Sequence, residues 1–98
     1  MTVQIRTDCF EAAVQLLILH DHNGETVLWG VEPATYYPIF QAAVLGQPPE
    51  AGCVWLRGWD ENAGLPESLA AAGVVALTGR TRRVGCHEAR EARLLFND

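Results

Sequence analysis

The chain has 98 residues, a formal net charge of −5 and no lysine, so its seven cations are all arginines. Apolar residues make up 49% and charged residues 19%, which predicts one packed domain over residues 1–98 and excludes a disordered chain. The acidic balance also disfavours direct binding to nucleic-acid phosphates, because that attraction needs clustered cations.

No segment is typical of a membrane span or a secretory leader. The apolar run 16–19 is far shorter than the roughly 20 residues that a membrane-spanning helix requires. The residues after Met1 lack the basic and apolar stretches of a signal peptide, so we expect a cytoplasmic protein. The cysteines Cys9, Cys53 and Cys86 include no C-x-x-C pair, which predicts reduced, mostly buried thiols.

The first third of the chain favours three strands. Alternation over residues 3–6 predicts a strand with one buried face. Residues 10–20 fit a helical face as well as a strand, but the Asn23-Gly24 pair before the β-rich run 26–29 is typical of a tight hairpin. We therefore expect a strand over residues 14–19, a turn, and a strand over residues 26–29.

The middle of the chain is rich in proline and aromatic residues. Pro33 and Pro38 bracket a segment that we expect to be irregular, because a residue before proline disfavours helical geometry. Residues 38–45 predict a short helix, with Gly46 just past its end.

The second half predicts a strand over residues 53–57 and a helix that begins near Pro66 and ends before Gly73. Two further strands are expected over residues 74–77 and 92–96, separated by a turn at 79–83 and a less regular connection at 85–90. The whole pattern predicts an α+β fold with a small, mainly antiparallel sheet of about five strands and one or two short helices.

Several short motifs recur together in one known group of proteins. They are D-x-x-G-E at residues 21–25, E-N-x-G-L at 61–65, A-G-[IV]-V at 72–75 and T-G-R-T at 78–81. In this order the chain resembles a family of small uncharacterised proteins carried by plasmids, phages and integrated mobile elements of bacteria. It departs from the family pattern at residues 30–52 and 84–87. The resemblance implies only a genomic context, an accessory gene of a mobile element with host or element proteins as partners, and no functional residue is carried over from it.

Several residue types could bear chemistry, and each also has a plain structural explanation. His20 and His22 lie two residues apart, as metal ligands on a strand would, but they flank an exposed turn and no third ligand follows; Cys86 and His87 leave the same question open. Cys9 and Cys53 lie in no hydrolase signature. We therefore expect no catalytic residue, no metal and no cofactor.

Charged residues at two places suggest binding or turn formation. Asp60 and Glu61 suit a turn that leads into the helix better than a catalytic carboxylate pair. The segment with Arg80, Arg82 and Arg83 could bind an anion through forked guanidinium groups, or discourage the pairing of an exposed strand edge.

Large aromatic residues are numerous for a small domain, and those outside the core would form an interface. Our first hypothesis is a non-enzymatic protein that binds a host or mobile-element protein, in its sharpest form an acidic, anti-CRISPR-like inhibitor of a host defence complex. The residues expected to bind the partner are Tyr36, Tyr37, Trp59, Asp60, Glu61, Arg80, Arg82 and Arg83. The alternatives are a small anion- or nucleotide-binding module at the three arginines and a metal enzyme at the paired histidines. A homodimer is compatible with each.

Overall fold

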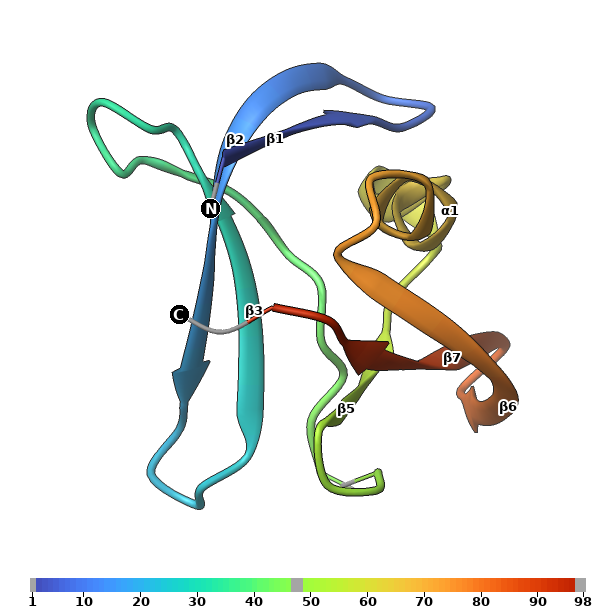
Figure 1. Ribbon diagram of the computed structural model, residues 1–98. Helices are drawn as coiled ribbons and strands as arrows, with labels where there is room; N and C mark the ends of the chain where they lie inside the picture. The colour runs from blue at the N-terminus through green and yellow to red at the C-terminus, as the bar shows by residue number, and fades with distance from the viewer. Residues whose placement is uncertain (1, 47–48, 97–98) are drawn as a thin grey trace.

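A computed structural model describes residues 2–46 and 49–96. Within these residues the chain forms seven strands in two antiparallel sheets, one α-helix and one 3-10 helix. The first sheet has the order β1-β2-β3-β4 and the second β5-β7-β6 (Figure 1). The elements are β1 (Thr2–Arg6), β2 (Glu11–His20), β3 (Thr26–Val31), β4 (Pro38–Gln41), β5 (Cys53–Leu56), η1 (Asp60–Asn62), α1 (Leu65–Ala71), β6 (Val75–Val84) and β7 (His87–Leu94).

The hairpin of β2 and β3 confirms the strand interpretation of residues 10–20. Its turn is held by the Asp21 carboxylate, which accepts hydrogen bonds from the backbone N–H groups of Asn23 and Glu25, each at 2.9 Å. Gly24 lies in the turn with φ of +80°, a conformation that favours glycine. The Asn-Gly signal thus marks the turn correctly.

The short helix predicted over residues 38–45 is wrong. These residues form β4 and an extended continuation, because the Phe40 ring packs directly on the backbone of Gly30 across the strand pair. A Cβ atom at Gly30 would lie 2.3 Å from Phe40 Cε2, so the close approach requires glycine. Phe40 also stacks on Phe10, with 6.1 Å between ring centroids. Burial of this ring outweighs the local helical pattern.

The turn predicted at residues 79–83 is also wrong, and so is the irregular connection at 85–90. β6 runs through the first segment with a bulge between Leu77 and Thr81, at which Gly79 has φ of +90°. Only Gly85 and Cys86 separate β6 from β7, and β7 ends at Leu94. Glycine at a bulge and glycine in a turn give the same local signal, so the strands predicted over residues 74–77 and 92–96 are too short; the strand that the prediction lacks is β4.

Residues 42–44 join the two sheets. The Ala42 N–H donates to the Leu28 carbonyl of β3 at 2.8 Å, and the Arg57 N–H donates back to the Ala42 carbonyl at 2.8 Å. Ala43 pairs with Leu56 of β5. The chain therefore crosses from one sheet to the other without leaving hydrogen-bonded, extended geometry.

Helix α1 covers the open side of this arrangement. β1 and β6 are the outer strands of their sheets, and α1 packs against both (Figure 1). Pro66 in the first turn and Gly73 after the last one bound the helix as predicted. The Ser68 hydroxyl accepts a hydrogen bond from the Arg6 N–H at 2.9 Å, which fixes the helix to β1.

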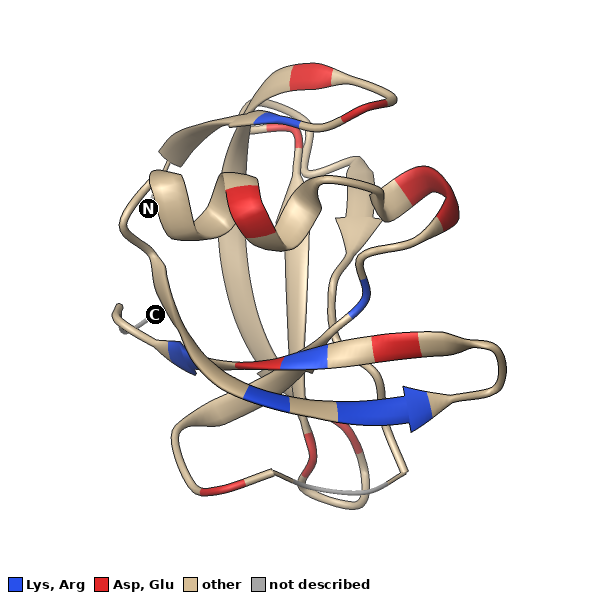
Figure 2. Ribbon diagram, turned by 90° about the vertical axis from the view of Figure 1, so that its right-hand side faces the viewer, with Lys and Arg blue, Asp and Glu red and all other residues tan. Residues whose placement is uncertain are grey.

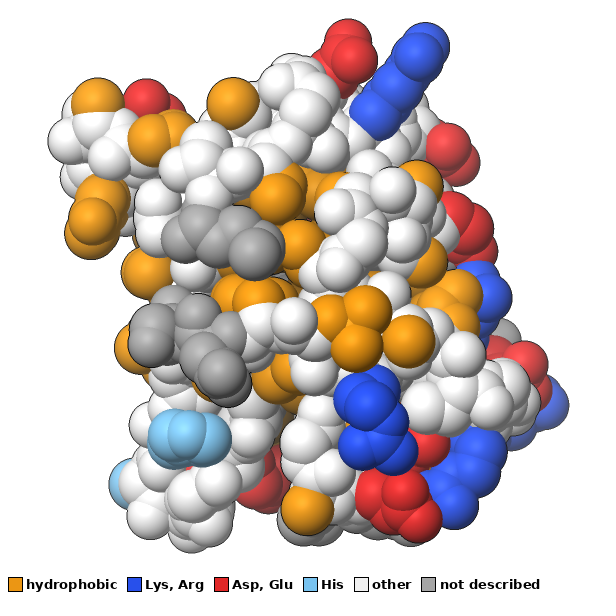
Figure 3. All heavy atoms as spheres, in the orientation of Figure 1, with side chains coloured by type: hydrophobic (Ala, Val, Ile, Leu, Met, Phe, Trp, Pro, Cys, Tyr) orange, Lys and Arg blue, Asp and Glu red, His pale blue; other side chains and the backbone are white. Residues whose placement is uncertain are grey.

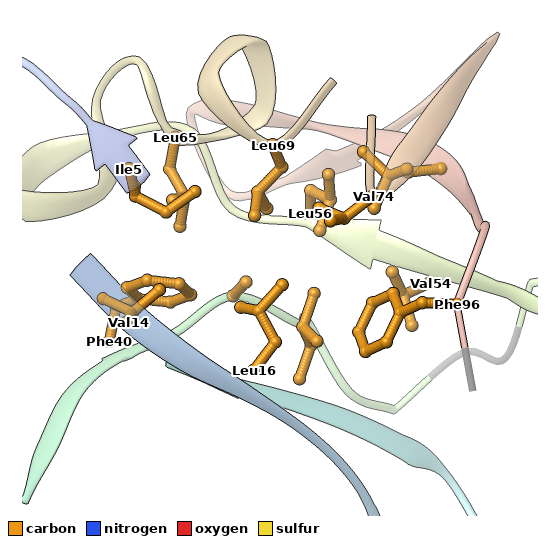
Figure 4. Packing of buried hydrophobic residues seen from close by; sticks show 14 residues of the cluster. Ile5, Val14, Leu16, Phe40, Val54, Leu56, Leu65, Leu69, Val74 and Phe96 are labelled. Atoms are coloured by element: carbon orange, nitrogen blue, oxygen red, sulfur yellow. The ribbon is translucent and has the colours of Figure 1, made fainter. Parts of the chain in front are cut away.

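The core lies between the two sheets and the helix. Figure 4 shows Val14, Leu16 and Phe40 of the first sheet facing Leu56 of the second and Leu69 of α1. Phe96, just beyond β7, is buried in the same cluster. In the described part of the chain, no helix has the length and apolar character needed to cross a bilayer.

Replacing Gly30 with alanine tests the contact between β3 and β4. The new Cβ would collide with the Phe40 ring, so Gly30→Ala should lower the free energy of unfolding by roughly 1–3 kcal/mol, the usual cost of overpacking. Urea unfolding measures the change. In a Phe40→Leu background, which removes part of the ring, the same substitution should cost less. An equal cost in both backgrounds would show that the ring contact is not the cause.

Candidate functional site

The turn between β3 and β4, residues 32–37, is stabilised by the side chain at its start. We call it the tyrosine loop. The Glu32 carboxylate accepts hydrogen bonds from the Thr35 hydroxyl at 2.8 Å, the Thr35 N–H at 2.6 Å and the Ala34 N–H at 2.9 Å. These bonds hold the pKa of Glu32 below its usual value, the Thr35 hydroxyl contributing most. The Tyr36 N–H donates to the Glu32 carbonyl, and the Glu32 N–H to the Tyr37 carbonyl. The loop is therefore closed at both ends.

This ordered loop presents two large aromatic side chains to solvent. Tyr36 is 60% exposed and Tyr37 73%. Tyr36 has φ of 61°, in the left-handed region that residues other than glycine seldom adopt. The loop extends away from the sheets, and hydrophobic side chains are visible at its end (Figures 1 and 3). The segment between Pro33 and Pro38 is irregular as predicted, and both tyrosines lie at the surface.

The segment from Trp59 to Glu61 forms a second strained turn. Asp60 begins η1 with φ of 54°; it and Tyr36 are the only non-glycine residues with positive φ among those described. The side chain of Asn62 is buried and donates from Nδ2 to the Gln41 carbonyl at 3.1 Å, which ties this turn to β4. Asp60 and Glu61 are both exposed. Aspartate adopts this left-handed conformation more readily than most other residues.

Trp59 lies at one wall of a groove that sequence reasoning missed. Its indole stacks on His87, with 4.7 Å between ring centroids and planes 3° apart. The Arg57 guanidinium lies 5.7 Å from the centre of the same indole, and its Nη2 is 4.0 Å from a Glu61 oxygen. We call this hollow of about 450 Å³ the Trp59 groove; it is lined by Gln41, Ala43, Val44, Leu45, Arg57, Trp59, Val84 and His87.

A second hollow shares two lining residues with the Trp59 groove. It is lined by Trp29, Pro38, Ile39, Phe40, Gln41, Arg57, Glu61 and Asn62. Both hollows include Gln41 and Arg57, and the second begins at Pro38, directly after Tyr37. Trp59 lines the first hollow and Glu61 the second, whereas Tyr36 and Tyr37 line neither.

The three predicted arginines do not converge. Arg80 donates from Nε and Nη2 to the buried carboxylate of Glu91, at 3.1 and 3.0 Å, and this contact raises the pKa of Arg80. Arg82 and Arg83 are neighbours in β6, so their side chains leave opposite faces of the strand. Arg80 is thus already paired with Glu91, and the other two arginines lie on opposite faces of β6. The three side chains therefore do not form one anion site.

Glu91 places a buried carboxylate on β7, the central strand of the second sheet. It is 1% exposed, and it also accepts from the Thr78 hydroxyl at 2.7 Å. Hydrogen bonds from Thr78 and then Arg80 hold the pKa of Glu91 below its ordinary value. The two residues that contact it lie at the bulge of β6. This network explains why the bulge is ordered.

The remaining candidates are spread over the surface. His20 and His22 are exposed around the β2–β3 turn, and the described residues contain no group of three or more histidine, cysteine or acidic side chains that could hold a metal. Cys53 is buried, which raises the pKa of its thiol, whereas Cys9 and Cys86 are exposed. The expectation of mostly buried cysteines is therefore wrong.

Some of the groove residues had a usable signal in the sequence. Arg57 and Trp59 are two positions apart in extended chain, which puts both side chains on one face. The contribution of His87 and Val84 depends on the pairing of β6 with β7, which no local pattern indicates. No protein-family model, curated protein or solved structure matches the chain.

The low pKa of Glu91 predicts how stability depends on pH. A carboxyl group whose pKa is lower in the folded state stabilises the fold above its unfolded pKa, and that contribution is lost as the pH falls. Glu91→Gln should therefore reduce the free energy of unfolding at pH 7 and weaken its decline between pH values of about 5 and 3. Glu88→Gln, an exposed position on the same strand, is the matched control. Equal pH profiles for wild type and Glu91→Gln, measured by urea unfolding, would contradict the assignment.

Proposed function

We propose that the protein is a non-enzymatic binding protein that contacts a partner protein through the tyrosine loop. The observation that supports this most is the exposure of Tyr36 and Tyr37, at 60% and 73%, on a turn closed by side-chain and backbone hydrogen bonds. Tyrosine offers a large, rigid contact area at a low cost in conformational entropy. Exposing two such rings has no benefit for folding, since burial of apolar surface is what stabilises a fold.

The fixed conformation of the tyrosine loop favours a role in binding a partner. A loop that is already fixed loses little conformational freedom when it binds, so more of the contact energy contributes to affinity. The Glu32 carboxylate makes three of these fixing contacts, and Tyr36 is held in a backbone conformation that costs energy.

The neighbouring surface indicates the chemistry of the partner. The second hollow leads from Pro38 to Glu61, and the exposed carboxylate of Asp60 lies next to it. Together with the net charge of −5, these carboxylates suit a partner that presents basic residues around an apolar patch.

A host defence complex that binds nucleic acid is the sharpest form of this proposal. Such complexes present cationic surfaces to phosphate backbones, and a small acidic protein can occupy them. The resemblance to small proteins of mobile genetic elements supports this context, in which the chain would act as an anti-CRISPR-like inhibitor in the cytoplasm. No catalytic step is part of the proposal.

Substitution of both tyrosines tests the proposal. Captured proteins from a lysate of the host should remain bound to wild type and to Leu19→Ser, and be lost from Tyr36→Ser/Tyr37→Ser. Leu19 is the matched control because it is a large hydrophobic residue, 48% exposed, on β2 rather than on the loop. With the purified partner, the double variant should bind at least about 30-fold more weakly, as expected for the loss of one hot-spot residue.

Two outcomes would count against the proposal. One is an identical set of proteins on wild type and on the double variant. The other is recovery of the wild-type protein without any companion at physiological salt. Added salt should also weaken the complex, because the carboxylates near Asp60 act through charge.

A further inference from the structure

Two arginines lie on either side of Ala89 on the face of the second sheet that is directed away from the core. Arg82 pairs with Ala89 between β6 and β7. Leu56 pairs with Arg90 at the end of β5, and continuing this register by one residue would bring Arg57 beside Ala89 from the other side. Directly opposed residues in antiparallel strands share a face, and two strand spacings place the two arginine Cα atoms about 10 Å apart. Ala89 is fully buried.

Neither guanidinium has its hydrogen bonds satisfied by the described part of the chain. Arg57 Nε and Arg82 Nη1 are buried and have no hydrogen-bond partner there. The ion pair of Arg57 with Glu61 is long, at 4.0 Å, and no ion pair involves Arg82 among the described residues. Arg80, by contrast, is bound by two hydrogen bonds to Glu91. A buried donor without an acceptor is costly, and either a water molecule or a ligand oxyanion can satisfy it.

The Trp59 groove adjoins this pair of cations. Arg57 lines the groove, and Val84, another lining residue, lies two positions after Arg82 on the same face of β6. Figure 2 shows basic positions on both strands of the β6–β7 hairpin, with acidic positions between them on β7. The groove combines the stacked rings of Trp59 and His87 with aliphatic walls, and its volume of about 450 Å³ is in the range of small-ligand sites.

We propose that this face binds a small ligand that combines a flat ring with an oxyanion, either a carboxylate or a phosphate. The oxyanion lies between Arg57 and Arg82, whose planar, forked donors match such groups. The ring occupies the Trp59 groove and contacts Trp59 and Leu45. The site does not use Tyr36 or Tyr37, but it shares Arg57 with the second hollow, which begins beside the tyrosine loop.

Nuclear magnetic resonance on the full-length ¹⁵N-labelled chain can detect this binding. The three tryptophans give three indole N–H signals, and Trp59→Phe identifies the one from the groove. The probes are adenosine monophosphate, indole-3-acetate and inorganic phosphate, with uncharged adenosine as the control. Adenosine monophosphate or indole-3-acetate should shift the Trp59 signal in a saturable way. Whichever of the two binds more tightly shows whether the site prefers a phosphate or a carboxylate. Adenosine should not shift it, and phosphate alone should bind more weakly.

Two adjacent arginines provide a matched pair of variants. Arg82→Gln should weaken binding about tenfold, the effect of losing one charged hydrogen-bond partner, and Arg83→Gln should change it less than about twofold. Both remove one charge from the same strand, but the Arg83 side chain leaves the opposite face. Circular dichroism and the thermal midpoint confirm that each variant is folded. Absence of any shift with all three anionic probes, or an equal loss for both variants, would overturn the proposal.

Discussion

The hydrogen bonds of residues 38–44 are the constraint on which the arrangement of the surface depends. This segment pairs with β3 at its beginning and with β5 at its end, so it belongs to both sheets. The tyrosine loop precedes it, and Gln41 in its middle accepts the hydrogen bond from buried Asn62 that fixes the Trp59 turn. Ala43, Val44 and Leu45 then form one wall of the Trp59 groove. A shift in register here would displace both candidate surfaces together.

That register is fixed by the pairing of Phe40 with Gly30. Side chains alternate between the faces of a strand, so a slip by one residue would turn Phe40 out of the core and expose it. The absence of a Cβ at Gly30 leaves space for the ring at one position only, since the neighbours Trp29 and Val31 carry large side chains. The core contact therefore determines where the polar groups of β4 point.

The sequence predicted those turns and helix ends that are set by residues within the same short segment. Asn23-Gly24 indicated the first hairpin, and Pro66 with Gly73 indicated the bounds of α1, because these residues restrict their own backbone. Residues 38–41 were mistaken for the start of a helix because they form a strand through the contact of Phe40 with Gly30, which a local pattern does not show. The flanking prolines suggested a surface loop without deciding whether Tyr36 and Tyr37 are exposed. The contact of Trp59 with His87 arises only when β7 pairs with both of its neighbours. Sites made by strand pairing are thus less visible in a sequence than sites made by a loop.

The two proposed binding surfaces differ in the distance over which their charges attract a partner. Four of the seven arginines, Arg57, Arg80, Arg90 and Arg93, form ion pairs with glutamates among the described residues. Such pairs are neutral at a distance, so the long-range field of the molecule follows its net charge of −5 and attracts a basic partner. The cations near the groove act only at short range, within about one Debye length of 8 Å at physiological salt. An anion at Arg82 must therefore be small enough to approach closely, which favours a free ligand over an acidic macromolecule, whose many charges the body would repel.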